Sequence, residues 1–338
     1  MTALVPSMEK GMGMKPAVAF LCGILLCLIG LPASADTDNS RIVLINRPYS
    51  VRDTRYEYPQ ELLRKALAEV SVTYGVKEVH CSRYTMSRDR LFQELLKGDL
   101  VQVVAEAPKP HWEQQLIPVR IPIRKGIQGY RVFLIKKGNE SRMREVRTLD
   151  DLMAMSTGSG AQWSTAPIMA RAGFDVVSGS NYEGLFRMLE QGRFITFGRG
   201  INEAYSELKA HKGAFPDLMV DPSVLLYIPL PTYFFVTPKR PELAKQIEAG
   251  LRAMQKDGSF DRLFYAYFGK DIERAHLGQR KIFFIPNPDL SAQTPFSDKK
   301  LWFDPQVDSR ILASLGAETQ SVSVGSQRQY CTYDSPLQ

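Results

Sequence analysis

The chain has 338 residues, and its 43 Lys and Arg against 36 Asp and Glu give a net charge of +7 at pH 7. Its basic residues form no lysine-rich block and match no nucleic-acid-binding motif, which argues against nucleic acid as a partner. The four histidines have no metal-ligand spacing, and the sequence contains neither GxxxxGK[ST] nor GxGxxG. We therefore expect no metal site and no cofactor.

Residues 1–35 have the pattern of a secretory signal peptide. Lys10 and Lys15 precede an apolar run at 17–30, and small residues follow up to Ala35, after which we expect cleavage. The run is too short for a comfortable membrane span, although an uncleaved N-terminal anchor is the alternative. The pattern predicts export to the periplasm.

Removal of residues 1–35 leaves 303 of the 338 residues, enough for two medium-sized lobes or one large domain. Two of the four cysteines leave with the leader, and Cys81 and Cys331 remain. Export permits one disulfide between them, which would tie the C-terminal tail to an early strand. Two separate thiols are the open alternative.

Strands and helices alternate along the first part of the mature chain. Apolar segments at 41–46, 76–84 and 100–107 predict strands. Pro59 suits the first position of a helix, and Ser87 suits the N-cap of another. The alternation predicts an α/β fold with right-handed crossovers.

The middle of the chain repeats this alternation. A strand is expected at 130–136, Thr148 is expected to cap a short helix, and Ser180 a longer one. Two glycine-containing segments, GSGAQWS at 158–164 and FGRGINE at 197–203, are expected to be turns before helices. Turns of this kind present backbone N–H groups on which an anionic or strongly polar group can dock.

The last part of the chain continues with two strands and two helices. Strands are expected at 217–230 and 232–238, a helix from Pro241, and another that Ser259 caps and Gly269 ends. Further on, KIFFIPNP from Lys281 predicts an edge strand. Residues 306–338 lose the apolar period and are expected to be a disordered or loosely attached tail.

Three segments in this order carry a resemblance to a known family: TLDDLMAMSTGSGAQWS, YEGLFRMLEQGRFITF and PTYFFVTPKRPELAKQIEAGLRAMQKDGSFDRLFYAYFG. From about residue 41 to 271 the chain resembles the periplasmic solute-binding proteins of bacterial family 3. The resemblance implies the type II two-lobe fold, each lobe a mostly parallel sheet flanked by helices. Lobe 1 would comprise 41–132 and 235–305, and lobe 2 would comprise 133–234. The strands at 130–134 and 233–236 would cross between the lobes as the hinge.

The chain departs from this family where amino-acid binders hold the ligand's charged groups. Those binders use a first-lobe arginine for the α-carboxylate, but AEAPKPHWEQQ at 105–115 contains none. They also use an aspartate after the Gly-Arg strand for the α-amine, and this chain has Arg199 there. These two departures favour an acidic or strongly polar solute over an ordinary α-amino acid, because arginine binds carboxylate or phosphate with two hydrogen bonds.

The expected ligand-binding residues lie on the two glycine segments and on the first lobe: Ser159, Gly160, Gln162, Trp163, Arg199, Asn202, Glu203, Tyr56 and Glu106. Each has a structural alternative. Ser159 would cap a helix, Trp163 would pack inside its lobe, and Arg199 would pair with Glu203 on the surface. One of Lys125, Tyr130 and Arg131 is expected to face the cleft, because side chains alternate along a strand.

The sequence thus predicts an exported, monomeric solute-binding protein that closes on a small polar solute. It would present that solute to an inner-membrane permease or to a sensor kinase. A dehydratase-like enzyme on the same scaffold, with Glu106 or Glu203 as acid or base, is the alternative of another class. An orphan receptor or scaffold is the third. No nucleophile-base pattern favours catalysis, and we expect no enzyme.

Overall fold

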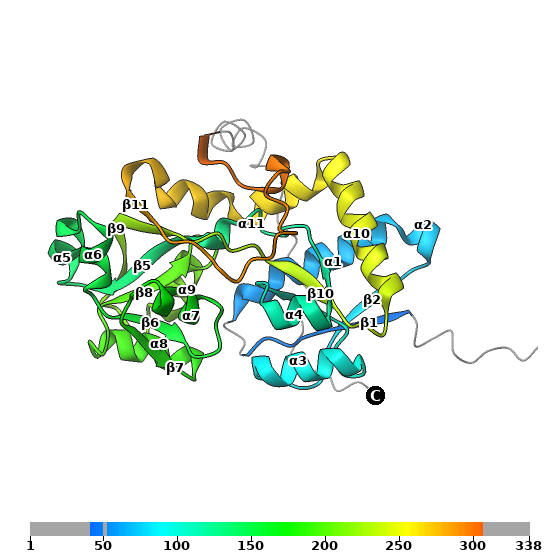
Figure 1. The fold of residues 1–338 in the computed structure, drawn as a ribbon, viewed down its shortest axis with the longest axis horizontal. Coiled ribbons are helices and arrows are strands. Elements are labelled where there is room, and N and C mark those ends of the chain that lie inside the picture. Colours follow the sequence, from blue (N-terminus) through cyan, green and yellow to red (C-terminus); the bar gives the residue numbers. More distant parts are fainter. Residues whose placement is uncertain (1–40, 50–52, 307–338) are drawn as a thin grey trace, which may run out of the picture. The chain divides into compact units, whose positions relative to one another are not determined.

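A computed structural model describes residues 41–49 and 53–306 of the chain (Figure 1). The expected signal peptide, Cys331 and the tail from residue 307 lie outside the described residues. Cys81 is disulfide-bonded, and the other three cysteines all lie outside the described part. Within 41–49 and 53–306, no helix combines the length and the apolar character that a membrane crossing requires.

The first sheet has five strands in the order β2-β1-β3-β10-β4. Strands β1, β2 and β3 run parallel, and β10 runs antiparallel to β3 and β4. Their bounds are Ile42–Ile45 (β1), Glu78–Cys81 (β2), Val103–Glu106 (β3), Ile117–Val119 (β4) and Tyr233–Val236 (β10).

Helices of the first lobe flank this sheet. In α1 the apolar residues Leu62, Leu63, Ala66 and Leu67 are buried, and α1 and α10 pack against each other. The bounds are Thr54–Tyr56 (η1), Glu57–Glu69 (α1), Ser71–Tyr74 (α2), Arg88–Lys97 (α3), Pro110–Gln115 (α4), Pro241–Lys256 (α10) and Ser259–Ala275 (α11).

The second sheet has six strands in the order β11-β9-β5-β8-β6-β7. Here β6, β7 and β8 run parallel, whereas β5 runs antiparallel to both of its neighbours. The bounds are Tyr130–Lys136 (β5), Thr157–Gly160 (β6), Val176–Gly179 (β7), Thr196–Gly200 (β8), Leu218–Tyr227 (β9) and Lys281–Phe284 (β11).

Five α-helices accompany the second sheet in the described residues, and short 3₁₀ turns complete the chain. The helices are Glu140–Glu145 (α5), Leu149–Met153 (α6), Thr165–Arg171 (α7), Tyr182–Glu190 (α8) and Ala204–His211 (α9). The 3₁₀ turns are Ile127–Gly129 (η2), Leu277–Gln279 (η3) and Lys299–Leu301 (η4). The predicted α/β class and the two-sheet architecture are confirmed.

The glycines of the two segments lie in strands, and the turns come after them, at 161–164 and 201–203, directly before α7 and α9. Gly158 and Gly160 lie in β6 because aromatic rings pack directly on them: an added Cβ would lie 2.3 Å from the Phe194 ring and 2.4 Å from the Trp163 ring. Gly198 and Gly200 likewise lie within β8. Close approach of a ring explains the first pair better than turn geometry does.

Two of the expected helix caps are confirmed and two are wrong. The Ser87 side chain accepts from Arg90 N, and Thr148 forms a capping box with Asp151. Helix α8 is capped by Asn181 instead of Ser180, because its amide oxygen reaches Gly184 N at 3.0 Å. The N-cap of helix α11 is Gly258 instead of Ser259, which is the first residue of the helix. The helix continues past Gly269 to Ala275.

The chain crosses between the sheets in loops and not along strands. Strand β5 belongs wholly to the second sheet and β10 wholly to the first, so the expected crossing strands are not crossings. The connections are residues 120–129 and 228–232. The register explains this, since β5 pairs with β8 and β9 along its length while β10 pairs with β3 and β4.

The C-terminal segment adds a further crossing. Strand β11 was expected inside the lobe 1 range, but it pairs with β9 at the edge of the second sheet. The chain then returns over both connections: Asn287 Nδ2 donates to Pro229 O at 2.9 Å, and Phe303 N donates to Lys125 O at 2.7 Å. The Trp302 ring covers Gly126, since a Cβ added at Gly126 would lie 2.6 Å from that ring.

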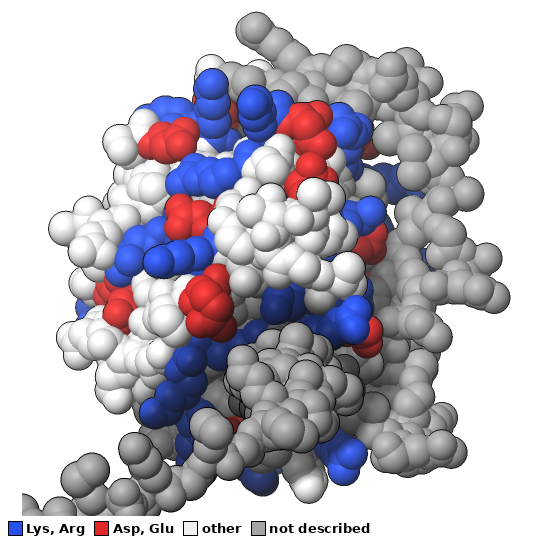
Figure 2. Space-filling model, turned by 90° about the vertical axis from the view of Figure 1, so that its right-hand side faces the viewer, with Lys and Arg blue, Asp and Glu red and all other residues white. Residues whose placement is uncertain are grey.

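Charged residues of both signs share the surface of the first lobe. Figure 2 views the molecule from the right-hand side of Figure 1, where the first lobe lies. On the described part of this face, Lys and Arg are interspersed with Asp and Glu. The distribution agrees with the spread of basic residues along the sequence.

Gly250 of α10 provides a test of how closely α1 and α10 pack. In Gly250→Ala the new Cβ would lie 1.9 Å from Ala66 O, so the helices must separate. We expect the free energy of unfolding to fall by about 1–3 kcal/mol, measured by urea denaturation. Gly184→Ala is the control, since the nearest atom to its Cβ is 3.4 Å away. An unchanged stability of Gly250→Ala would contradict the close contact.

Candidate functional site

A cleft lies where the carboxyl ends of parallel strands from both sheets meet, which is where open α/β sheets commonly bind ligands. It has about 640 Å³ of empty space, including open solvent at its mouth. It is lined by Arg55, Tyr56, Arg88, Ala105, Glu106, Ala107, Arg124, Gln128, Arg131, Trp163, Ser164, Thr165, Arg199, Asn202, Glu203, Leu230 and Thr232.

Arg199 at the end of β8 is neutralised by two carboxylates. Its Nε and Nη2 donate to the two oxygens of Glu207, each at 2.7 Å, and Nη2 lies 3.0 Å from a Glu203 oxygen. Its guanidinium carbon lies 4.3 Å from the centre of the Trp163 ring. Burial alone would lower the pKa of Arg199, but Glu203 and Glu207 outweigh burial and hold that pKa above its usual value.

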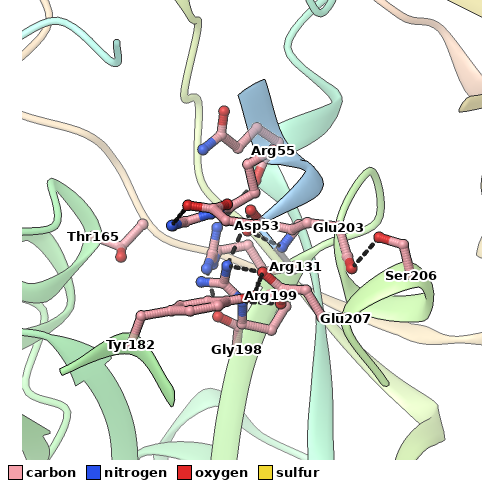
Figure 3. Close-up of polar contacts among 12 residues, drawn as sticks. Asp53, Arg55, Arg131, Thr165, Tyr182, Gly198, Arg199, Glu203, Ser206 and Glu207 are labelled. Carbon is pink, nitrogen blue, oxygen red and sulfur yellow. Dashed lines mark hydrogen bonds and ion pairs between the residues drawn. The ribbon is translucent and has the colours of Figure 1, made fainter. Parts of the chain in front are cut away.

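Glu203 is a buried carboxylate of the cluster drawn in Figure 3. It accepts a hydrogen bond from Gly200 N at 3.1 Å. Burial alone would raise the pKa of Glu203, but Arg199, Arg131 and Arg55 together hold it below its usual value. The Glu203 side chain therefore remains ionised at neutral pH.

Arg124 and Arg131 differ from Arg199 in having no carboxylate within ion-pair distance among the described residues. Arg131 donates to Gln128 O at 3.2 Å and to Gly198 O, and Arg124 donates to Arg55 O at 2.7 Å. Arg131 is 2% exposed and Arg124 is 7% exposed, and the Nε atom of each has no hydrogen-bond partner in the described part of the chain. Burial lowers the pKa of Arg131 to about 10, so its charge is retained at neutral pH.

Two further arginines reach the cleft from the first lobe, each with a carboxylate. Arg88, the first residue of α3, pairs with Glu106 at the end of β3. Arg55 in η1 donates to both oxygens of Asp53, at 2.6 and 2.8 Å. The arginines of this cleft therefore divide into three with carboxylate partners and two without.

No protein-family model matches this chain, and no curated protein sequence matches it. Solved structures do. An ancestral arginine-binding protein bound to arginine has a TM-score of 0.51 at 20% identity, over 68% of this chain and 99% of that chain. The chain has the type II periplasmic binding protein fold.

Two other structures with this fold give similar figures. The Salmonella typhimurium periplasmic binding protein with high arginine specificity has a TM-score of 0.51 at 16% identity, over 68% of this chain and 99% of its own. A Silicibacter pomeroyi periplasmic His/Glu/Gln/Arg/opine family-binding protein in complex with lysine has a TM-score of 0.50 at 12% identity, over 68% and 98%.

Most of the candidate residues expected from the sequence lie together in the cleft. Those that line it are Tyr56, Glu106, Trp163, Arg199, Asn202 and Glu203. The Arg199–Glu203 pair is present, but it is buried and not on the surface. Trp163 both lines the cleft and stacks on Phe197, at 6.1 Å between ring centres.

Three candidate residues lie behind or beside the cleft. Ser159 lies 3.5 Å from the Thr165 hydroxyl, and Gly160 provides the floor under the Trp163 ring. Gln162 instead connects the lobes, because it donates to Asp89 at 2.6 Å and accepts from Arg88 N at 3.2 Å. Lys109 of the first lobe adds a hydrogen bond to Gln162 O at 3.3 Å.

Sequence reasoning missed the arginines that the first lobe and the connections supply. Arg55, Arg88 and Arg124 were not predicted, whereas Arg131 was a candidate and does line the cleft. A signal was available: Arg55 follows β1 and Arg88 follows β2, at the carboxyl ends of parallel strands. Among the residues that the structure describes, no three His, Cys, Asp or Glu are grouped to hold a metal ion.

The Arg199–Glu207 pair provides a test of the cluster. Glu207→Ala leaves Arg199 buried with Glu203 alone and removes the acceptor of the Tyr182 hydroxyl. We expect the free energy of unfolding to fall by about 3–5 kcal/mol, measured by denaturant titration.

The control is Glu190→Ala, which removes a partly exposed carboxylate 3.8 Å from Lys136. That change should cost about 1 kcal/mol or less. Equal losses in the two variants would contradict a special role for the buried pair.

Proposed function

We propose that this protein binds a small solute carrying a carboxylate, of amino-acid size, in the cleft between its lobes. The observation that carries the proposal is the pair Arg124 and Arg131, both buried and without a carboxylate partner in the described residues. Removing a charge from water is costly unless an opposite charge replaces the lost hydration. A carboxylate is the planar anion that a guanidinium binds with two hydrogen bonds.

The charge balance of the cleft supports an anionic group. Five arginines line it against two glutamates, and Asp53 and Glu207 bring the carboxylates to four. One positive charge is left in excess. A bound carboxylate would cancel it.

Unpartnered polar atoms support the same proposal. Buried atoms without a hydrogen-bond partner include the Nε of Arg88, Arg124 and Arg131, the Ser164 hydroxyl and the Asn202 amide oxygen, and all five residues line the cleft. Buried polar groups are normally satisfied, and a polar ligand would satisfy these. We propose that Asn202, Glu203 and Glu106 contact the polar parts of the solute.

The apolar part of the solute would contact Tyr56 and Trp163, which line the cleft from opposite lobes. In this proposal Arg199 contributes positive charge and supports Trp163, while Ser159, Gly160 and Gln162 position the wall. Amino-acid size is supported by the proteins with the same fold, which bind arginine or lysine.

We further propose that the lobes move about residues 120–129 and 228–232 and that the closed form docks on a membrane permease or a sensor. The expected signal peptide would place the protein in the periplasm. A binder returns its ligand unchanged, and mass spectrometry of the recovered solute distinguishes it from an enzyme.

The anion site is tested by Arg131→Gln. A thermal-shift screen of amino acids and other small carboxylates identifies a ligand of the unchanged protein, and calorimetry then gives its affinity. We expect the variant to bind at least about tenfold more weakly, because a hydrogen bond to a charged group contributes about 1.5–3 kcal/mol.

Arg120→Gln is the matched control, since Arg120 pairs with Glu113 and does not line the cleft. Its affinity should equal that of the unchanged protein. If Arg131→Gln binds as tightly as this control, Arg131 is not the anion-binding residue.

The hydrogen bonds that Gln162 forms with the other lobe are tested by Gln162→Ala. The change removes the side-chain contacts with Asp89 and Arg88, whose exposed hydrogen bonds together are worth about 1 kcal/mol. We expect a larger radius of gyration in small-angle scattering of the ligand-free protein. Gln191→Ala, an exposed change on the same lobe, should leave the radius unchanged. A radius unchanged in Gln162→Ala would contradict the bridging role.

A further inference from the structure

Four aromatic rings surround the guanidinium of Arg55. Its central carbon lies 4.4 Å from the centre of the Tyr182 ring, 5.7 Å from Tyr56, and 5.9 Å from both Tyr49 and Trp163. Aromatic faces attract a cation within about 6 Å of the ring centre. We call these four rings with Asp53 the aromatic cage.

The cage also has the negative charge that a cation needs. Asp53 has a fully buried side chain and accepts two hydrogen bonds from Arg55. The Tyr182 hydroxyl donates to Glu207 at 2.9 Å, which places a second carboxylate behind the ring. Burial alone would lower the pKa of Arg55, but Asp53 outweighs burial and holds that pKa above its usual value.

The cage is assembled from both lobes and opens on the cleft. Arg55, Tyr56 and Asp53 come from the first lobe, whereas Trp163 and Tyr182 come from the second. Arg55, Tyr56 and Trp163 all line the cleft. Figure 3 shows Arg55 and Asp53 next to the cluster that contains Arg199 and Tyr182. The guanidinium thus projects from one lobe into the space that the other lobe closes.

Arg55 is also linked to the proposed anion site. Its backbone oxygen accepts from Arg124 Nη2 at 2.7 Å. The cage and the two arginines without carboxylate partners therefore lie in one cleft. A solute held by Arg124 and Arg131 through its carboxylate would extend toward the cage.

We propose that Arg55 is a specificity-determining residue that occupies a cation site from within the chain and so excludes solutes carrying a guanidinium or ammonium side chain. The exclusion rests on the proposed function, because it concerns which carboxylate solutes the cleft accepts. A cationic side chain entering the cage must displace Arg55 from Asp53 or lie beside a like charge in a poorly solvated space. Neutral and acidic side chains meet no such repulsion.

The occupied cage also gives Asp53 a counterion in the absence of a ligand's cation. Asp53, if unpaired, would be a buried charge that stays ionised only at a large cost. Arg55 supplies the missing charge and, through Tyr182, a contact between the lobes. Replacing it with a small residue should leave an empty cage that a soluble cation can enter.

The test is Arg55→Ala with methylguanidine, a probe that has no carboxylate and so does not depend on the anion site. Calorimetry should show binding to the variant at least about tenfold tighter than to the unchanged protein, since a cation–aromatic contact alone is worth about that factor when desolvated. Arginine, which carries both groups, should gain at least as much affinity.

Two control variants identify the source of the gain. Arg55→Lys keeps a cation in the cage and should not gain affinity for methylguanidine. The double variant Asp53→Asn with Arg55→Ala removes the carboxylate and should lose the gain. A folded Arg55→Ala protein that binds methylguanidine no better than the unchanged protein would overturn the inference.

An unstable variant still gives a result. If Arg55→Ala is insoluble, it is refolded with and without millimolar methylguanidine. A higher yield with the probe supports the cage, and an equal yield overturns it. Failure of the proposed function has a different signature: the unchanged protein then binds no carboxylate solute, while Arg55→Ala still binds methylguanidine.

Discussion

The interaction on which the cleft depends is the pairing of its arginines with carboxylates, because five arginines line it. Burial of a guanidinium is tolerated when a carboxylate or several oxygens replace its hydration. Three of the five arginines satisfy this condition within the chain, through Asp53, Glu106 and Glu207. In the described residues, the other two, Arg124 and Arg131, donate hydrogen bonds to backbone oxygens. The negative charge of Glu203 acts on both of them from a greater distance. That imbalance is the basis of the proposed binding of an anion.

The position of the cluster follows from strand direction. Parallel strands place their carboxyl ends at one edge of a sheet, and both sheets turn that edge toward the cleft. Residues that follow β1, β2 and β3 therefore face residues that follow β6 and β8. Arg124 and Arg131 lie on and after the connection between the sheets, so they are placed at the bottom of the cleft by topology and not by either lobe alone.

The C-terminal segment links the two sheets once more. After α11 the chain returns to the second sheet and then across the connections. Trp302 covers Gly126, and Phe303 and Asn287 bind the backbone of the two connections. These contacts bind the two connections to each other, which restricts the backbone where the lobes would move.

Much of the fold was determined by the sequence alone, because apolar periodicity and caps are local. Most strands, the helix from Pro241, and the Ser87 and Thr148 caps were predicted, whereas β4 and β6 were not. The boundaries that failed, at Ser180 and Ser259, failed because a neighbouring Asn or Gly served the helix end better. The glycine segments were misread because only packing shows that a ring lies on Gly158 and Gly160.

The sequence also indicated which segments of the second lobe reach the cleft, since Trp163, Arg199, Asn202 and Glu203 lie on the two glycine segments. Only the tertiary structure decided their partners. Glu207 lies eight residues beyond Arg199, and the rings around Arg55 come from four separate positions, so no local pattern records either arrangement. Charge pairing in a buried cleft is set by distances across the fold, and those distances exist only once both sheets are in place.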